Sequence, residues 1–357
     1  MFPACRTAGE PFALPQFART RSDLETFMEE LRGCHTALRA CCARQEPRDQ
    51  FFHDMVGPCS ALERKSIEPM ALQLEGGKVR AMQRLVSAAL WDEAAMLETY
   101  HCLIQDEMGE PDGVLLVEET GFVKKGQDSV GGARQYCGAL GQVEHGPVGV
   151  CAASASRQGY ALVDQRRFLP EAWFTDAYQE RRTQCKVPDE GVWQRTPQWA
   201  AAMVQALHQP GILPFKSMVA DCLYGHSPDF WAACEACGGI VACVATPADT
   251  RGWRQSLATT TPTSPSKGTQ RTQRVAVTDT PPRTVAALAQ AMPATFWYRR
   301  TVAEGTTGPS TYECARKRLR LCKEGQPTTA VWVLLTRTLG AHPQYGYSLS
   351  NAPVRAP

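Results

Sequence analysis

Acidic side chains follow two short apolar runs of this chain, a pattern that suits metal-dependent or acid–base chemistry. Residues 114–117 (VLLV) lead directly into Glu118 and Glu119, and residues 217–220 (SMVA) lead into Asp221. Carboxylates at the carboxyl ends of neighbouring strands commonly build metal and phosphate sites in α/β sheets. Two other interpretations stay open from these residues alone: the acids lie in solvated turns, or Asp221 caps the helix that follows it.

Cationic residues accompany both the first acidic pair and the helix-like segments before it. Cations beside carboxylates suit a substrate that carries phosphate, but a run of charges is also typical of a solvated surface. The residues that we consider as phosphate or substrate contacts are Lys124, Lys125, Arg134, Tyr136, Arg64, Lys65 and Arg84.

The elements that must position these residues are strands and helices of a mixed fold. The length and the β-branched content of residues 114–117 predict a strand that is buried on both faces. Residues 148–155 and 160–169 are predicted to form two further strands, residues 197–208 a helix, and residues 217–220 another strand. Both acidic groups are therefore expected at strand ends.

The first part of the chain, residues 1–110, is predicted to be a helical bundle. Ser22 and Glu25 have the spacing of a capping box, and apolar residues follow them at helical spacing, so a helix is expected to begin there. The same periodicity predicts helices within residues 61–74, 78–90 and 93–108.

Composition limits the classes of protein to which the chain can belong. The 357 residues are 43% hydrophobic, which is enough for a large globular core, and 38 Lys and Arg against 36 Asp and Glu give a net charge of only +2. Contacts to nucleic acid must therefore come from local basic patches. Fifteen cysteines are scattered through apolar segments. With no secretory leader and no long apolar run, this usage predicts a reduced, cytoplasmic protein without a membrane span.

The second half of the chain contains a cysteine pair and a long polar stretch. Cys234 and Cys237 form a lone CxxC, which predicts two buried helical positions better than a zinc site. Residues 246–283 are rich in Thr, Ser and Pro and carry Lys267, Arg271 and Arg274, so a mobile polar loop is expected there. Strand-like runs then return within residues 294–336.

The stretch VEETGFVKKGQDSVGGARQYCGALGQ, which begins at Val117, resembles the signature of bacterial insertion-sequence DDE transposases. The resemblance extends to LERKS and MQRLVSAALWD before it, and to YALVDQRRFLPEAWFTD and VADCLYG after it. Together these segments cover most of residues 55–245. Weaker similarity continues in FWYRRTVAEGTTGP and in LSNAP near the end of the sequence.

The resemblance implies an α/β fold with a ribonuclease H-like mixed sheet flanked by helices. By this comparison, residues 1–110 form a helical DNA-binding domain and residues 111–245 the catalytic core. Residues 246–340 form a β-rich insertion, and residues 341–357 a tail in which the last catalytic helix would begin. The partner implied is double-stranded DNA, and homodimerisation is left open.

The resemblance also assigns the acids. Glu118, Glu119 and Asp221 match the family's catalytic positions. By this comparison, Glu118 and Asp221 are ligands of Mg²⁺ or Mn²⁺. If the site has degenerated in this chain, the ability to bind that ion would be lost. Such enzymes hold two metal ions with three carboxylates, which activate the attacking oxygen and stabilise the leaving oxygen. Lys124, Lys125 and Arg134 match the family's basic loop.

Two departures from the family pattern bear on activity. Glu118 stands where the family has aspartate, which moves the carboxylate away from the strand by one methylene. No Asp or Glu follows Glu324, so the glutamate of the family's last catalytic helix has no counterpart, although Glu304 or Glu313 would substitute if the insertion folded back.

The function expected from these observations is DNA binding with an ancestry in phosphodiester cleavage and strand transfer, impaired or inactive in this chain alone. The alternatives are a recruited enzyme that acts on a small molecule in the same pocket, and a DNA-binding regulator.

Overall fold

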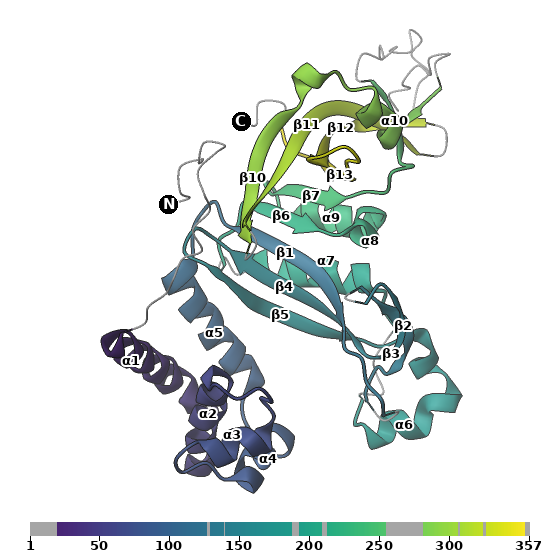
Figure 1. Ribbon diagram of the computed structural model, residues 1–357. Coiled ribbons are helices and arrows are strands. Elements are labelled where there is room, and N and C mark those ends of the chain that lie inside the picture. The colour runs from purple at the N-terminus through teal and green to yellow at the C-terminus, as the bar shows by residue number, and fades with distance from the viewer. Residues whose placement is uncertain are drawn as a thin grey trace, which may run out of the picture. The chain divides into compact units, whose positions relative to one another are not determined.

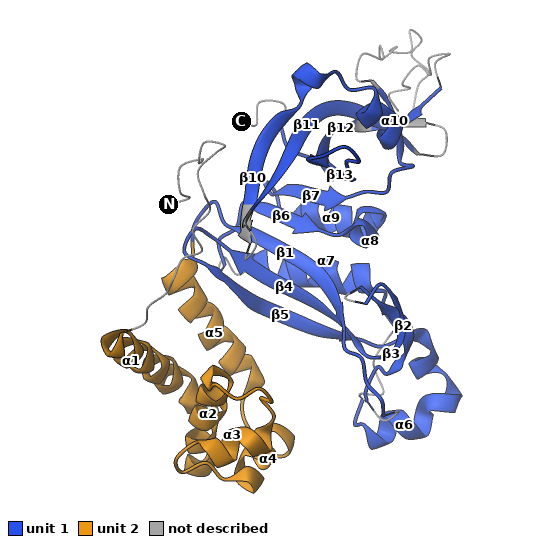
Figure 2. Ribbon diagram, viewed as in Figure 1, with its two compact units in different colours: residues 1–12, 110–357 blue, residues 13–109 orange. Residues whose placement is uncertain are grey.

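The computed structural model describes residues 20–126, 129–138, 140–187, 193–208, 213–254, 281–305, 308–323 and 326–353. The chain divides into two compact units, residues 13–109 and residues 110–357 together with 1–12 (Figure 2). Among the described helices, none is long and apolar enough to cross a bilayer.

The smaller unit is a bundle of helices. Its main elements are α1 (Arg21–Leu38), α2 (Gln45–Val56), α3 (Ile67–Gln73), α4 (Val79–Ser87) and α5 (Glu93–Met108). Met70 and Ala71 of α3 pack with Met82 of α4 to form its small core. The predicted helical character of this region is confirmed, and α5 begins where the sequence predicts it, with Asp92 capping the amide of Ala95.

The expected capping box of the first helix is wrong by two residues. Thr20, not Ser22, is the N-cap: its hydroxyl accepts a hydrogen bond from the Asp23 amide at 3.2 Å, and Asp23 accepts one from the Thr20 amide at 2.7 Å. Aspartate at the third helical position completes the reciprocal bonds as glutamate would. Ser22 lies within the first turn of α1.

The larger unit is built on a mixed sheet (Figure 1). β4 (Val148–Ala155) pairs antiparallel with β1 (Val114–Gly121) and β5 (Tyr160–Phe168), while β6 (Ser217–Ala220) and β7 (Val241–Ala245) continue parallel to β1. The order β5-β4-β1-β6-β7 is the ribonuclease H-like arrangement that the resemblance implies.

Helices cover one face of these strands. α7 (Thr196–His208) and α9 (Pro228–Ala236) lie on the side where Leu115, Val117 and Met218 are buried (Figure 1). On the other face, Leu116 is 39% exposed and Val219 is 42% exposed. The prediction that the first strand is buried on both faces is therefore wrong, because burial alternates along β1. We call the side of Leu116 and Val219 the open face.

Short elements connect the core strands. β2 (Ala133–Cys137) and β3 (Gln142–Gly146) form a separate hairpin after β1, followed later by α6 (Gln179–Gln184). The four-residue α8 (Cys222–Gly225) follows β6 directly. Cys234 on α9 and Cys237 at its end are both buried, which confirms that interpretation of the CxxC.

The sheet continues beyond β7 into the β-rich part of the chain. These elements are β8 (Arg251–Arg254), β9 (Arg283–Thr284), α10 (Val285–Gln290), β10 (Tyr298–Gly305), β11 (Gly308–Lys323), β12 (Gln326–Thr338) and β13 (Tyr345–Ser350). β13 lies between β7 and β12, so residues 345–350 form a sheet strand rather than the predicted tail. Lys267, Arg271 and Arg274 lie outside the described residues.

Both ends of this β-rich part meet at β7. β13 pairs antiparallel with β7, and Asn351 then accepts a hydrogen bond from the Ala242 amide at 2.8 Å and donates one to the Ile240 carbonyl at 3.3 Å. The side chain of Asn351 thus takes the place of a backbone partner at the start of β7.

Candidate functional site

Two neighbouring parallel strands bring Glu118 and Asp221 together. Val117 of β1 is in register with Ala220 of β6, so Glu118 and Asp221 occupy the next position on each strand. Both residues follow the alternation of Leu116 and Val219, which places them on the open face. The structure therefore brings together two candidate acids that are far apart in the sequence.

Asp221 does not act as a helix cap. It is the N-cap residue of α8 by position, but its carboxylate makes no capping hydrogen bond to that helix. The side chain is exposed and lies close enough to Glu118 and Glu119 to influence their ionisation. The capping interpretation of this acid is accordingly wrong, and its carboxylate is available for another partner.

Glu119 belongs to the opposite side of β1. It alternates with Val117 toward the helix-covered face, where it is hydrogen-bonded to the side chain of Thr196 at the start of α7. Glu118, in contrast, accepts a hydrogen bond from the Glu119 amide at 3.0 Å. The three acids thus form a cluster around the end of β1, but only two of them share a face.

Tyr224 is buried close to the three acids. Its side chain is fully buried, its ring lies 5.3 Å from that of Phe230, and among the described residues its hydroxyl has no hydrogen-bond partner. Burial raises the pKa of Tyr224, and the charges of Glu119, Glu118 and Asp221 raise it further. The neutral hydroxyl is therefore a donor held beside the carboxylates.

Sequence reasoning missed Thr196 and Tyr224. Tyr224 comes three residues after Asp221, so one helical turn is enough to return it toward the strand end, and that spacing was the available signal. Thr196 carries no comparable signal, because its proximity to Glu119 depends on how α7 packs against the sheet.

The acids raise one another's pKa values. Burial raises the pKa of Glu119, repulsion from Glu118 and Asp221 adds to the effect, and the Thr196 hydroxyl opposes it. Burial likewise raises the pKa of Glu118, with an opposing contribution from the Glu119 amide and a further increase from Asp221. At neutral pH, ionised acids here destabilise the fold unless a cation compensates them.

We expect Glu119→Gln to stabilise the protein at about pH 7.5 and to have little effect at about pH 4. The folded-state pKa of Glu119 lies above its ordinary value. Below that ordinary value both states keep the proton, and as pH rises the unfolded state releases it first, which costs stability. Thermal melting at the two pH values measures the difference. Glu171→Gln, the same change at an exposed position, is the control, and an equal effect of Glu119→Gln at both pH values would contradict the prediction.

The predicted basic contacts of the larger unit lie beyond the end of β1. Lys124 and Lys125 are exposed, and Arg134 and Tyr136 lie on β2, with Tyr136 61% exposed. The Lys124 amide donates to the His145 carbonyl at 2.9 Å, which ties this segment to β3. Arg134 and Tyr136 therefore share one face of the hairpin and the two lysines precede it, whereas Glu118 and Glu119 lie farther back along β1.

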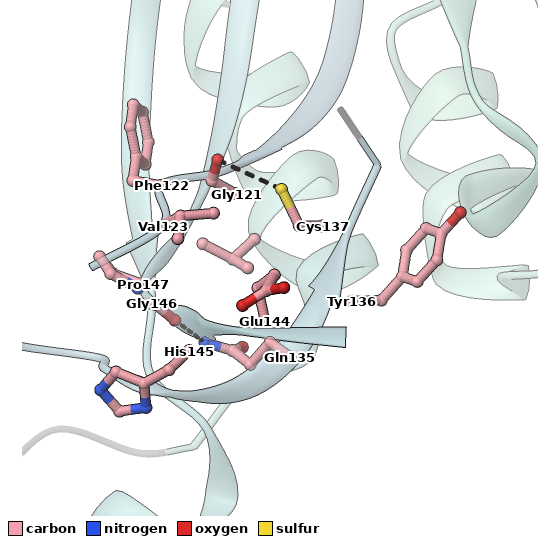
Figure 3. A pocket seen from close by; sticks show the side chains of 11 residues that line it. Gly121, Phe122, Val123, Gln135, Tyr136, Cys137, Glu144, His145, Gly146 and Pro147 are labelled. Carbon is pink, nitrogen blue, oxygen red and sulfur yellow. Dashed lines mark hydrogen bonds between the residues drawn. The ribbon is translucent and has the colours of Figure 1, made fainter. Parts of the chain in front are cut away.

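A small hollow lies between the end of β1 and the β2–β3 hairpin (Figure 3). Cys137 points into it and contacts the Gly121 carbonyl at 3.7 Å, whereas Tyr136 points away. The lining residues do not include Glu118, Glu119 or Asp221. Tyr136 and Cys137 therefore line this hollow, whereas Lys124 and Arg134 are not among its lining residues.

The other predicted contacts belong to the helical unit. Lys65 donates to the Pro58 carbonyl at 2.6 Å, and Arg84 forms an ion pair with Glu46 at 2.7 Å. Arg64 precedes Lys65 in the loop before α3.

The carboxylate oxygens suit a hard divalent ion, but the set is incomplete. Within the described ranges, no three His, Cys, Asp or Glu side chains are arranged to hold a metal ion. Glu313, considered as a substitute third ligand, is engaged by Arg337 at 2.7 Å and by Arg299 at 3.7 Å. Glu118 and Asp221 therefore offer two ligands on one face.

Comparisons with known proteins identify the family. One solved structure, a piggyBac transposase synaptic complex with hairpin DNA studied by cryo-EM, is similar with a TM-score of 0.35 and 10% identity. The match covers 99% of this chain and 56% of that chain, so this chain spans about half the length of that protein. No curated protein matches. The family model described as DDE superfamily endonuclease matches residues 37–309. Since this match spans most of the sequence and includes Glu118, Glu119 and Asp221, the chain belongs to the DDE superfamily endonucleases.

Proposed function

We propose that this chain is a DNA-processing protein of the transposase type in which Glu118 and Asp221 hold a divalent cation against a phosphodiester. The observation that supports the proposal most directly is their placement at corresponding ends of two parallel strands, within a chain of the DDE superfamily. Because Glu118 and Asp221 are the two of the three candidate acids that share the open face, we expect catalysis by this chain alone to be weak or absent.

The chemistry of the donor set supports Mg²⁺ or Mn²⁺. Endonucleases of this superfamily generally use a divalent metal, and carboxylates are the ligands that such ions prefer. When bound, the ion would supply Lewis-acid activation of water and of the leaving oxygen. Glu119 is held by Thr196 on the other face, so its role would be to adjust the charge around Glu118. The neutral hydroxyl of Tyr224 would keep its proton and offer a hydrogen-bond donor beside the cluster.

The proposed partner is duplex DNA. Lys124, Lys125 and Arg134 are exposed cations near the end of β1, and we propose that they contact phosphates, with Tyr136 beside them. Arg64, Lys65 and Arg84 of the helical unit are proposed as further phosphate contacts. Homodimerisation remains a proposal of the same kind.

Metal dependence of the wild-type chain tests this function. We expect Mn²⁺ at about millimolar concentration to raise the melting temperature, since the ion binds only the folded cluster. We expect it also to permit slow nicking of supercoiled plasmid. The melting curve requires no activity and thus separates binding from catalysis. Absence of both effects would refute the metal-site proposal.

A second candidate, a DNA-binding protein that does not cut, is favoured by the absence of a third ligand among the described residues. It predicts gel retardation of duplex DNA that fades steeply as salt rises, without nicking in Mn²⁺. Nicking that requires Mn²⁺ would reject this candidate, whereas retardation without nicking would establish it.

A further inference from the structure

A row of arginines and aromatic rings occupies one face of the β-rich part of the sheet. Along β11, Ala315 and Leu319 are buried against α10, so the residues that alternate with them, Arg316, Arg318 and Arg320, point to the other side. The neighbouring strands β10 and β12 contribute their residues in register with these. We call this surface the Arg–Trp face, and it consists of Arg300, Arg316, Arg318, Arg320, Tyr298 and Trp332.

Contacts within the Arg–Trp face hold its guanidinium groups in place. The guanidinium carbons of Arg316 and Arg318 lie 5.3 and 5.6 Å from the centre of the Trp332 ring, and that of Arg300 lies 5.3 Å from the Tyr298 ring. Arg318 also donates to the Ala330 carbonyl at 3.0 Å. Ordering these long side chains in advance lowers the entropic cost of binding an anion.

Two donors of this face remain unused by the protein. The Nε atoms of Arg318 and Arg320 are buried and have no hydrogen-bond partner among the described residues. Arg320 bonds through another nitrogen to the Thr328 carbonyl at 3.2 Å. Buried donors are normally satisfied, so these guanidinium edges are suited to a ligand that brings acceptor oxygens.

Charge on the two sides of these strands is organised differently. On the side of α10, Glu313 compensates Arg299 and Arg337. On the Arg–Trp face, none of the described side chains of β10, β11, β12 and β13 is Asp or Glu. Among the described side chains, Arg300, Arg318 and Arg320 therefore place positive charge on a face to which these strands contribute no carboxylate, and this complements a polyanion.

The Arg–Trp face is continuous with the open face that carries the acid pair. The strand register connects the two faces from one strand to the next. Val219 of β6 pairs with Cys243 of β7, which pairs with Ser350 of β13. Ser350 then pairs with Trp332 of β12, which pairs with Arg318 of β11. Val219 precedes Asp221 by two residues on the same side of β6. Four strand spacings separate the arginines from that strand, or about 20 Å measured along the sheet. Figure 1 shows β10, β11 and β12 bending away from the core strands within the same unit.

We propose that the Arg–Trp face binds an unpaired DNA strand next to the site of Glu118 and Asp221. The proposal rests on the DNA-processing function proposed above and adds the surface and the form of DNA. The arginines contact successive phosphates, and the planar groups, with Tyr298 45% exposed, stack on bases. Stacking of this kind requires bases that are free of a duplex partner.

Binding of labelled oligonucleotides to the full chain tests the proposal. The probes are a single strand of about 20 nucleotides and the corresponding duplex. Fluorescence anisotropy measures the affinity of each probe at a series of salt concentrations without metal. We expect the double variant Arg316→Gln/Arg318→Gln to bind the single strand about tenfold more weakly and the slope of log K against log salt to fall by about 1.4, the value for two lost phosphate contacts. Arg299→Gln removes one positive charge from the opposite side of β10 and should leave both quantities unchanged.

The outcomes separate this proposal from the proposed function. The proposal is overturned if the double variant melts like the wild type and binds the single strand with unchanged affinity. It is also overturned if the variant loses affinity equally for the single strand and for the duplex. Arg316→Lys/Arg318→Lys, which retains charge but not planarity, should keep the salt slope and lose part of the affinity. Asp221→Asn should bind the single strand like the wild type, so a failure of the metal site leaves this result intact.

Discussion

Asp221→Asn is expected to remove the stabilisation by Mn²⁺ and to lower any metal-dependent nicking by more than about a hundredfold. The amide keeps the size of the side chain but lacks the charge that binds the ion. Asp221 makes no capping bond to α8, so its replacement should not destabilise that helix. Isothermal calorimetry with Mn²⁺ and plasmid nicking measure the two effects.

The matched control for this variant is Asp229→Asn. Asp229 is an exposed acid in the first turn of α9, and its change to asparagine alters the net charge by the same amount. We expect it to retain Mn²⁺ binding. Equal Mn²⁺ affinity in wild-type protein and Asp221→Asn would show that Asp221 is not a ligand, whatever the activity.

Glu118→Asp is expected to act in the opposite direction and to improve the site. In the wild type, the longer side chain returns to accept a hydrogen bond from the adjacent Glu119 amide. Aspartate, which the resembling transposases have here, would hold its carboxylate nearer the strand and beside Asp221. Since a misplacement of about 1 Å can cost on the order of a hundredfold in rate, we expect a gain in nicking of up to that size and tighter Mn²⁺ binding.

Glu119→Asp is the appropriate comparison for that gain. It shortens the neighbouring acid by the same methylene, but on the face where Thr196 binds it, so no improvement is expected. Should both variants behave alike in calorimetry, side-chain length at position 118 would not be what limits the metal site.

The sequence was sufficient to predict the strands of the core and the meeting of Glu118 with Asp221. Acids that directly follow short apolar strands give a strong local signal, and adjacent parallel strands then bring their ends together. The limits of α7, β4 and β6 follow equally from local patterns and turn residues. These features depend on short-range sequence information.

Features that depend on contacts between strands or helices far apart in the sequence could not be predicted from local patterns. Glu118 and Glu119 point to opposite faces because they are adjacent in a strand, but which of them shares the open face with Asp221 depends on the side that α7 covers. The Arg–Trp face requires the register of β11 with β12, which places Arg318 opposite Trp332. Neither residue is distinctive alone, because an arginine on a strand is usually a solvated surface residue.

The pairing of β13 with β7, completed by Asn351, has a consequence for how this protein can change over time. The polypeptide leaves the core after Ala245 and returns to the same strand at Ser348. The segment between Ala245 and Ser348 is therefore an insertion whose two ends are held together by the pairing of β7 with β13. Lengthening such a loop adds little to the entropic cost of closing it. Mutation can therefore remodel the Arg–Trp face in size and sequence while the spacing of Glu118 and Asp221 stays as it is.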